Sequence, residues 1–314
     1  MKKLTLLLLL LFLLITVASC KPFEGLIRTQ PKQLQLFEVH TGATGVEMAF
    51  VENAPPAEVY ENNLLELAVE VENTGGTDAE GVTVFGIPTD IMTIKRGTER
   101  NTFTLKGKTG TLPIGDRERF VILTQAKELL EERQTTTVTA NTCYKYSTTA
   151  MSIVCIKPKT ALQREVSEIC TPQVKNFKEG QGGPVGVVKI EKPIVTPLNN
   201  GIKPTIILHI RNLGTGIVVA EPHYEEFCRS RTQLRQRDAL VNIVTVNAKL
   251  SNQQLTCTPS QVLLEQNTED TAVSCSIEQG FADEAGTYEA LLEVKLTYGY
   301  VEQKTKNVVI KKIL

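Results

Sequence analysis

The sequence contains no tryptophan, only three histidines, and aromatic residues make up 5% of its 314 residues. Without tryptophan, a sugar-binding platform of stacked indoles is excluded. The sequence also lacks the His-Glu-x-x-His pair of helical metalloproteases, the Gly-x-Ser-x-Gly elbow of hydrolases and a Walker loop. Its formal net charge of −1 offers no basic excess for nucleic acid. The composition therefore predicts a protein without catalytic activity, cofactor or nucleic-acid partner.

The N-terminus has the pattern of an export signal. Lys2 and Lys3 precede an apolar run over residues 4–17, which is shorter than the roughly 20 residues of a membrane-spanning helix. The small residues Val-Ala-Ser then lead into Cys20, as in the lipobox of bacterial-type lipoproteins. We therefore predict a signal peptide over residues 1–19 and a lipid on Cys20 that anchors the chain on the extracytoplasmic face of the cell membrane. Secretion after cleavage nearby, and an uncleaved short anchor, are the alternatives.

The cysteine count agrees with export. The chain has seven cysteines, and six remain once Cys20 carries the lipid. An even set tends to form disulfides in an oxidising compartment, and many connectivities are open. Six free thiols are the alternative, and a zinc site is not expected because no Cys-x-x-Cys occurs. Pairing each cysteine with a near neighbour in its own domain predicts the bridges Cys143–Cys155, Cys170–Cys228 and Cys257–Cys275.

Short alternating segments dominate the rest of the chain. Apolar residues recur at every second position from Leu65 to Val71, which is the period of a half-buried strand. Similar segments with turn residues between them follow to the end of the chain, and only residues 126–133 have a helical pattern. Many short strands with little helix favour an all-β fold built as a β-sandwich.

An internal repeat divides this pattern into two halves. A strand followed by Asn73-Thr74-Gly75-Gly76 leads later to Tyr144-Lys145-Tyr146, and a strand followed by Asn212-Leu213-Gly214 leads to Tyr298-Gly299-Tyr300. The repeat predicts two related domains in tandem. The expected boundaries are a tether at 20–40, domain 1 at 41–158, a linker at 159–183 and domain 2 at 184–314.

In residues 67–84 a strand ends in Asn73-Thr74-Gly75, and the chain then leads through alanine to Val82-Thr83-Val84. This segment resembles the start of CARDB-type (cell-adhesion-related) domains. Residues 207–219 are a weaker copy, and the Tyr-x-Tyr strands resemble the late strand of such domains. The resemblance implies two tandem Ig-like β-sandwich domains. It also implies a surface location, because such domains serve as spacers or adhesion modules in exported prokaryotic proteins, often archaeal ones.

Four further features offer candidate sites, each with a simpler structural interpretation. His209 reads as an exposed or partly buried strand residue. The stretch from His223 to Cys228 could hold a metal, or could be a surface loop with Cys228 in a disulfide. The glycine-rich residues 180–184 are interpreted as a flexible entry to domain 2 rather than a phosphate-binding loop, because a strand follows them. A basic run could bind an acidic glycan or a partner's carboxylates, or could be solvated; it comprises Arg229, Arg231, Arg235 and Arg237.

Together these patterns predict a lipid-anchored cell-surface protein with a structural or adhesion role. Its partner would be a surface protein or a glycan of unknown identity. One alternative is a subunit of an envelope or appendage assembly. Another is a solute-binding lipoprotein, although such proteins use long helices around a cleft, and the sequence predicts almost none.

Overall fold

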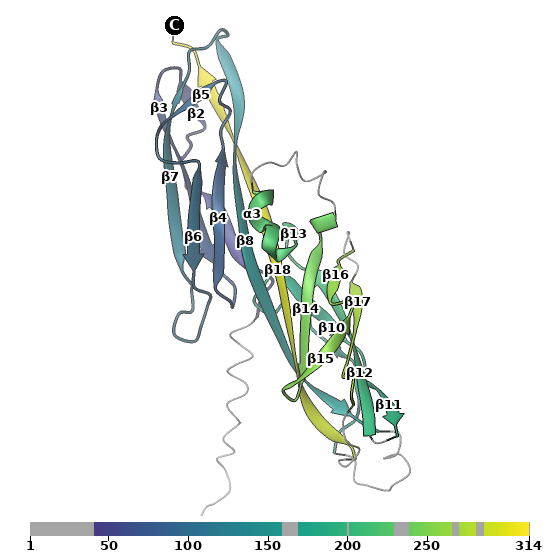
Figure 1. The fold of residues 1–314 in the computed structure, drawn as a ribbon. Helices are drawn as coiled ribbons and strands as arrows, with labels where there is room; N and C mark the ends of the chain where they lie inside the picture. The colour runs from purple at the N-terminus through teal and green to yellow at the C-terminus, as the bar shows by residue number, and fades with distance from the viewer. Residues whose placement is uncertain are drawn as a thin grey trace, which may run out of the picture. The chain divides into compact units, whose positions relative to one another are not determined.

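The computed structural model describes residues 41–158, 169–199, 201–228, 239–265, 270–280 and 286–313. Nearly all regular structure in these ranges is β-strand (Figure 1). The helical segments among them are the 3-10 turn η2 (Glu221–His223) and the single turn α3 (Tyr224–Phe227). The predicted all-β class is therefore confirmed. The predicted signal peptide and tether, residues 1–40, lie outside the described residues.

Two sheets make up the described residues. The smaller sheet has four strands in the order β1 (Val46–Phe50), β3 (Leu64–Asn73), β7 (Arg117–Ala126) and β5 (Met92–Arg96). The main path of the larger sheet is β6 (Arg100–Leu105), β4 (Ala79–Gly86), β8 (Arg133–Ile156), β18 (Tyr288–Lys311), β14 (Ile243–Leu250), β15 (Gln253–Thr258), β17 (Thr271–Ser276), β12 (Gly201–Asn212), β10 (Val185–Ile190) and β9 (Lys175–Asn176). The short strands β2 (Glu58–Tyr60), β11 (Ile194–Leu198), β13 (Ile217–Val219) and β16 (Gln261–Leu263) pair along its sides.

The sheets pack through the alternating apolar residues that the sequence pattern marks. Leu65, Leu67, Val69 and Val71 of β3 are all buried, and the intervening glutamates Glu66 and Glu70 lie outside the core. Phe103 of β6 contacts Phe120 of β7 with their ring centroids 6.4 Å apart, which places the two sheets face to face. One continuous apolar core extends from these residues to β12, β14 and β17. This layered packing gives a β-sandwich-like fold.

The long strands β8 and β18 join the two halves of the sequence. They pair antiparallel over 24 residues each, from Arg133 opposite Lys311 to Ile156 opposite Tyr288. The first half of β8 also pairs with β4, whereas the first half of β18 pairs with β14. One long strand thus comes from each half of the sequence, and the pair extends past the strands of both halves (Figure 1). The described residues fall within one compact unit, Phe37–Leu314. The domain boundaries at residues 158 and 183 stay a prediction.

The helix predicted at residues 126–133 is absent. These residues connect β7 to β8 without helical structure. Leu129 is buried, and its N–H donates to the carboxylate of Glu61 at 2.7 Å. The N–H of Ile313 donates to the same side chain at 3.1 Å. These hydrogen bonds hold the pKa of Glu61 below its usual range. The prediction was wrong because the chain turns around this acceptor, and no local pattern in residues 126–133 reveals it.

Candidate functional site

Four tyrosines form a buried cluster at the middle of the β8–β18 ladder. Tyr144 lies opposite Tyr300, and Tyr146 lies opposite Tyr298. The ring centroids of these cross-strand pairs are 5.8 and 6.2 Å apart. None of the four side chains is more than 3% exposed. We call these four residues the tyrosine cluster.

The second tyrosine of each Tyr-x-Tyr motif holds a turn of its own half. The N–H of Thr77 donates to the hydroxyl of Tyr146 at 3.2 Å, and the N–H of Gly216 donates to the hydroxyl of Tyr300 at 2.8 Å. The Tyr146 hydroxyl also donates to the carbonyl of Gly182 at 2.9 Å. The two hydroxyls therefore anchor corresponding turns against the centre of the ladder.

The first tyrosine of each motif binds the start of an outer strand. The N–H of Val46, where β1 begins, donates to the hydroxyl of Tyr144 at 3.2 Å. The N–H of Val185, where β10 begins, donates to the hydroxyl of Tyr298 at 3.3 Å. Val46 and Val185 thus occupy equivalent positions in the two halves.

The asparagines of the two turns also make matching contacts. Asn73 and Asn212 each donate from their side-chain amide to the carbonyl four residues later, at 2.8 and 2.9 Å. Each accepts a hydrogen bond from the glycine two residues later, Gly75 at 3.2 Å and Gly214 at 3.1 Å. The repeated Asn-x-Gly and Tyr-x-Tyr motifs therefore mark one arrangement that the chain builds twice.

Burial also affects the titration of the tyrosine cluster. Burial raises the pKa of Tyr144, Tyr146, Tyr298 and Tyr300 far above the ordinary tyrosine value. The four hydroxyls therefore stay protonated at any physiological pH and act as fixed hydrogen-bond donors and acceptors.

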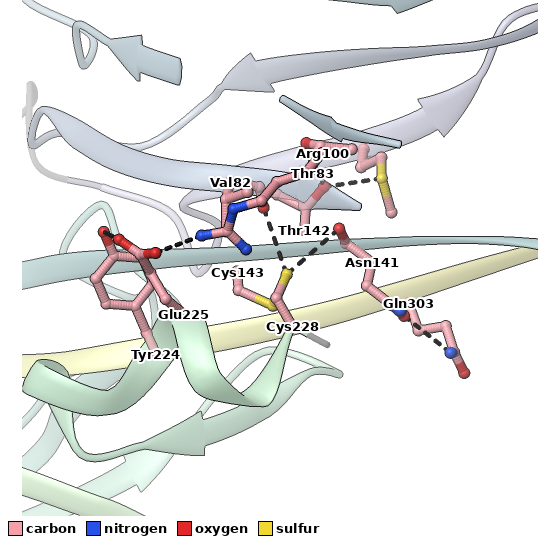
Figure 2. Close-up of a disulfide and its surroundings, with 11 residues drawn as sticks. Val82, Thr83, Arg100, Asn141, Thr142, Cys143, Tyr224, Glu225, Cys228 and Gln303 are labelled. Atoms are coloured by element: carbon pink, nitrogen blue, oxygen red, sulfur yellow. Dashed lines mark hydrogen bonds and ion pairs between the residues drawn. A yellow bond between two sulfur atoms is a disulfide. The ribbon is translucent and has the colours of Figure 1, made fainter. Parts of the chain in front are cut away.

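The opposite face of the ladder is covered by α3, which a disulfide holds in place. Cys228, directly after α3, is bonded to Cys143 of β8 (Figure 2). The sulfur of Cys228 lies 3.5 Å from the carbonyl oxygen of Val82 and 3.6 Å from that of Asn141. These are packing contacts, because a disulfide sulfur carries no proton. The disulfide and its apolar neighbours form a second, smaller core: Val82, Cys143, Val219, Tyr224, Phe227, Cys228 and Val301.

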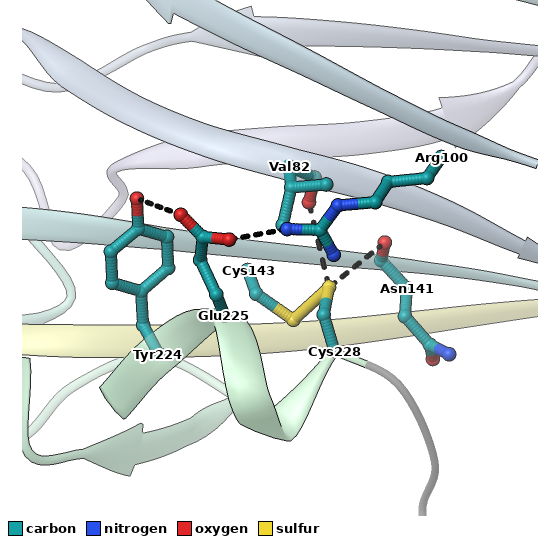
Figure 3. A network of polar contacts seen from close by, with 7 residues as sticks. All are labelled: Val82, Arg100, Asn141, Cys143, Tyr224, Glu225 and Cys228. Carbon is teal, nitrogen blue, oxygen red and sulfur yellow. Dashed lines mark hydrogen bonds and ion pairs between the residues drawn. A yellow bond between two sulfur atoms is a disulfide. The ribbon is translucent and has the colours of Figure 1, made fainter. Parts of the chain in front are cut away.

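An ion pair adds a second link between α3 and the first half of the chain. Figure 3 shows the guanidinium of Arg100, on β6, directed at the carboxylate of Glu225 on α3. Both side chains are partly exposed, so the pair itself contributes little to stability. Burial, with a smaller effect of Glu225, raises the pKa of Tyr224 to about 12. One guanidinium nitrogen of Arg100, Nη1, is buried and has no hydrogen-bond partner among the described residues.

The disulfides agree only in part with the predicted pairing. The bridge Cys257–Cys275 is present, and its residues lie directly opposite each other on β15 and β17. The predicted Cys143–Cys155 bridge is wrong because both residues lie on β8, about 40 Å apart along an extended strand. The predicted Cys170–Cys228 bridge is wrong as well. The observed bridges are Cys143–Cys228 and Cys155–Cys170.

Only some of the other predicted site residues lie within the described residues. Cys20 and the basic run Arg229, Arg231, Arg235 and Arg237 lie outside the described residues, and their roles stay predictions. His209 is partly buried, as predicted, and hydrogen-bonds to Glu191 at 2.8 Å. His223 hydrogen-bonds to Glu226 at 3.1 Å while Cys228 is in a disulfide. Among the described residues, no three His, Cys, Asp or Glu side chains converge as metal ligands.

The glycine-rich stretch at residues 180–184 is predicted to be a flexible entry to domain 2, but it is buried and hydrogen-bonded in the structure. Residues 180–184 are all buried. The N–H of Gly182 donates to the carbonyl of Gly42 at 2.8 Å, and its own carbonyl accepts from Gly76 at 2.8 Å. A Cβ on Gly183 would lie 2.2 Å from the Thr148 hydroxyl. The backbone at Gly42, Gly76 and Gly182 therefore lies close together here, and the absence of a side chain at Gly183 leaves room for Thr148.

Glu302 is a carboxylate near the tyrosine cluster whose burial changes its titration. It is partly buried on β18, and burial raises its pKa above the usual range, with Glu47 adding to the effect and Lys304 opposing it. Between its unfolded and folded pKa, the folded state holds more protons than the unfolded state. The free energy of unfolding therefore falls as the pH rises through this window, and the loss persists at neutral pH.

Replacing Glu302 by glutamine should remove this cost. We expect Glu302→Gln to raise the melting temperature by a few degrees at pH 7, and to have little effect at about pH 3, where the carboxyl group is largely protonated in both states. Calorimetry from pH 3 to pH 8 measures the effect. Glu289→Gln, at an exposed position of the same strand, is the matched control and should show a smaller change. An equal gain for the two variants at pH 7 would contradict the assignment to burial.

None of the helices described here is long and apolar enough to cross a bilayer. No protein-family model and no curated protein matches this chain.

Proposed function

We propose that the chain is an exported, lipid-anchored cell-surface protein that acts as a rigid structural or adhesion module without catalytic activity. The observation that carries the proposal is the three disulfides placed within one duplicated β framework. Disulfides persist in oxidising compartments outside the cytoplasm, which favours export. The signal-peptide pattern before Cys20 supports the same location.

The mechanical role follows from the connection between the two halves. Bending the protein at its centre would disrupt the continuous β8–β18 ladder and the tyrosine cluster, and the covalent Cys143–Cys228 bridge would resist it. Such a framework keeps a fixed distance between its ends, which suits a spacer or an adhesion module. The repeated Asn73 and Asn212 turns support the further proposal that both halves are Ig-like domains of the CARDB type.

Partners would bind at loops or sheet edges, because the core of the framework is closed. The basic run, from Arg229 to Arg237, is our candidate for contacts with an acidic glycan or protein. The described residues on either side of it are held in place, since Cys228 is in a disulfide and the carbonyl of Leu240 accepts from Ala220 at 2.8 Å.

Mass spectrometry of the native N-terminus tests the anchor. We expect the first peptide to begin at Cys20 with a diacylglyceryl group on its sulfur. The variant Cys20→Ser should lose that mass, and at least nine-tenths of the protein should move from the membrane fraction to the medium. Ser19→Ala, which keeps a small residue before Cys20, should stay lipidated. An unmodified Cys20 thiol in the native protein, or Cys20→Ser remaining in the membrane fraction, would rule out this anchor.

A further inference from the structure

The far end of β18 lies in the first half of the protein, between three other segments of the chain. Residues 309–311 pair with the start of β8 on one side and, in parallel, with β2 on the other (Figure 1). Ile310 among them is fully buried. The connection from β7 to β8, residues 127–132, lies beside this end, because the N–H of Lys312 donates to the carbonyl of Glu132 at 2.9 Å. We call residues 309–313 the β18 end.

One buried side chain ties these segments together. Glu61 directly follows β2, is only 5% exposed, and donates its own N–H to the carbonyl of Lys311 at 2.8 Å. Its carboxylate oxygens accept from two different segments. Oε2 accepts from the N–H of Leu129 at 2.7 Å, and Oε1 accepts from the N–H of Ile313 at 3.1 Å. Both oxygens are therefore needed as acceptors at the same time.

The surroundings of Glu61 favour its charged form. The N–H of Leu129 is the largest cause that lowers the pKa of Glu61; burial opposes it, and the N–H of Ile313 and the charge of Lys312 add to it. The other charged side chains on the elements around it are Glu58 on β2, Lys311 on β18, Arg133 on β8, and Lys127, Glu128, Glu131 and Glu132 on the connection.

A protonated Glu61 can satisfy only one of its two backbone donors. The added proton gives one oxygen an O–H, which then faces an N–H instead of accepting from it. Leu129 is 3% exposed, so a free N–H there would stay buried at a cost, whereas Ile313 is 56% exposed and its N–H can bind water instead. The bond to Ile313 is also the longer of the two. Protonation therefore releases Ile313 and keeps Leu129.

We propose that the Glu61 carboxylate is an acid-sensitive latch that holds the β18 end while it is charged and releases it on taking up a proton from the solvent. Because the pKa of Glu61 is lower in the folded than in the unfolded chain, the latch is complete at neutral pH. It is lost only as the pH falls below about 4. Release frees the backbone groups of β8 at residues 133–135, which lie opposite residues 309–311, and a freed strand edge can pair with another chain. The latch does not depend on export or on a lipid.

Hydrogen exchange of the full-length protein, read by mass spectrometry and corrected for the intrinsic rate at each pH, tests the latch. Between pH 7 and about pH 2 we expect the β18 end to lose about tenfold in protection, while residues 142–148 at the centre of the ladder keep theirs. Glu61→Gln has a single acceptor oxygen in its side chain and should show the acid level of protection already at pH 7.

Glu58→Gln is the matched control. It removes a carboxylate of β2 that forms an ion pair with Lys311 at 2.5 Å, with both side chains more than a third exposed. Such a surface pair contributes little, so this variant should keep the protection of the unaltered protein at pH 7. Unchanged protection at residues 142–148 confirms that both variants are folded.

Three results would overturn the proposal. The first is equal protection of the β18 end at the two extremes of pH in the unaltered protein. The second is a Glu61→Gln variant that behaves as the unaltered protein does at pH 7, or a Glu58→Gln variant that loses as much protection. The third is a loss of protection at residues 142–148 together with the β18 end, which would assign the acid effect to unfolding of the whole protein.

Discussion

Replacing Cys143 and Cys228 together by serine should lower the melting temperature by roughly 10–15 °C. The bridge closes a loop with a sequence separation of 85 residues, and a loop of that length corresponds to about 4–5 kcal/mol of stabilisation by the chain-entropy relation. Each kcal/mol shifts the melting temperature of a protein of this size by about 2–4 °C. The serines also remove the covalent link that holds α3 over the centre of the ladder.

A second double variant provides the control. Cys155→Ser with Cys170→Ser opens a loop with a separation of only 15 residues, which corresponds to about 3 kcal/mol. Its melting temperature should therefore lie between those of the unaltered protein and of the first double variant. Calorimetry of the three oxidised proteins in one buffer makes the comparison. An equal loss of melting temperature in the two double variants would contradict the chain-entropy explanation.

The fold class follows from the sequence because burial in a sandwich imposes a period of two. In β3 the alternation of leucine and valine with glutamate gives both the strand and its inner face. The positions of the tyrosine cluster could also be predicted in part from the sequence. The repeated asparagine turns, at Asn73 and Asn212, and the repeated Tyr-x-Tyr motifs indicate equivalent positions. No sequence pattern indicates that the tyrosine hydroxyls bind the turns.

The long ladder could not be predicted from local patterns. Residues 135–140 and 152–156 suggest two separate strands, whereas β8 runs unbroken between them. This continuity depends on β18, which lies about 150 residues later in the chain and pairs with β8 over its whole length. The predicted cysteine pairing failed for the same reason. Nearness in sequence predicts nearness in space only when the chain turns, and between Cys143 and Cys155 it does not.

The contacts of α3 were likewise hidden from sequence analysis. Arg100 and Glu225 are 125 residues apart, and each is an ordinary surface residue by its local context. The His223–Cys228 stretch attracted attention as a possible metal site. Its actual role is structural, because Cys228 bonds to Cys143 and Tyr224 and Phe227 pack in the smaller core.

The duplicated turns lead to a second prediction of large effect, tested with a double-mutant cycle. A Cβ on Gly214 would lie 2.2 Å from the Tyr300 hydroxyl oxygen, closer than any real contact, with Pro184 Cβ next at 3.0 Å. Gly214→Ala should therefore cost about 3 kcal/mol, in the range of overpacking in a dense core. Tyr300→Phe should cost about 1–3 kcal/mol, because it leaves the N–H of Gly216 without its acceptor. In the combined variant the hydroxyl that clashes is gone, so we expect its cost to fall short of the sum by at least about 1 kcal/mol.

The equivalent pair in the first half supplies the control, because the repeat is not perfect. A Cβ on Gly75 would lie 2.0 Å from the Tyr146 hydroxyl, but also 2.5 Å from the carbonyl oxygen of Gly182 and 2.7 Å from that of Thr44. Tyr146→Phe removes only the first of these contacts, and backbone carbonyls cannot move aside as a side chain can. Gly75→Ala should therefore strongly destabilise the protein with or without Tyr146→Phe. The coupling energy of the Gly75–Tyr146 pair should be much smaller than that of the Gly214–Tyr300 pair. Urea denaturation of the two sets of variants measures both couplings. Equal couplings would show that the backbone around Gly182 yields, and that the centre of the protein is less rigid than its packing indicates.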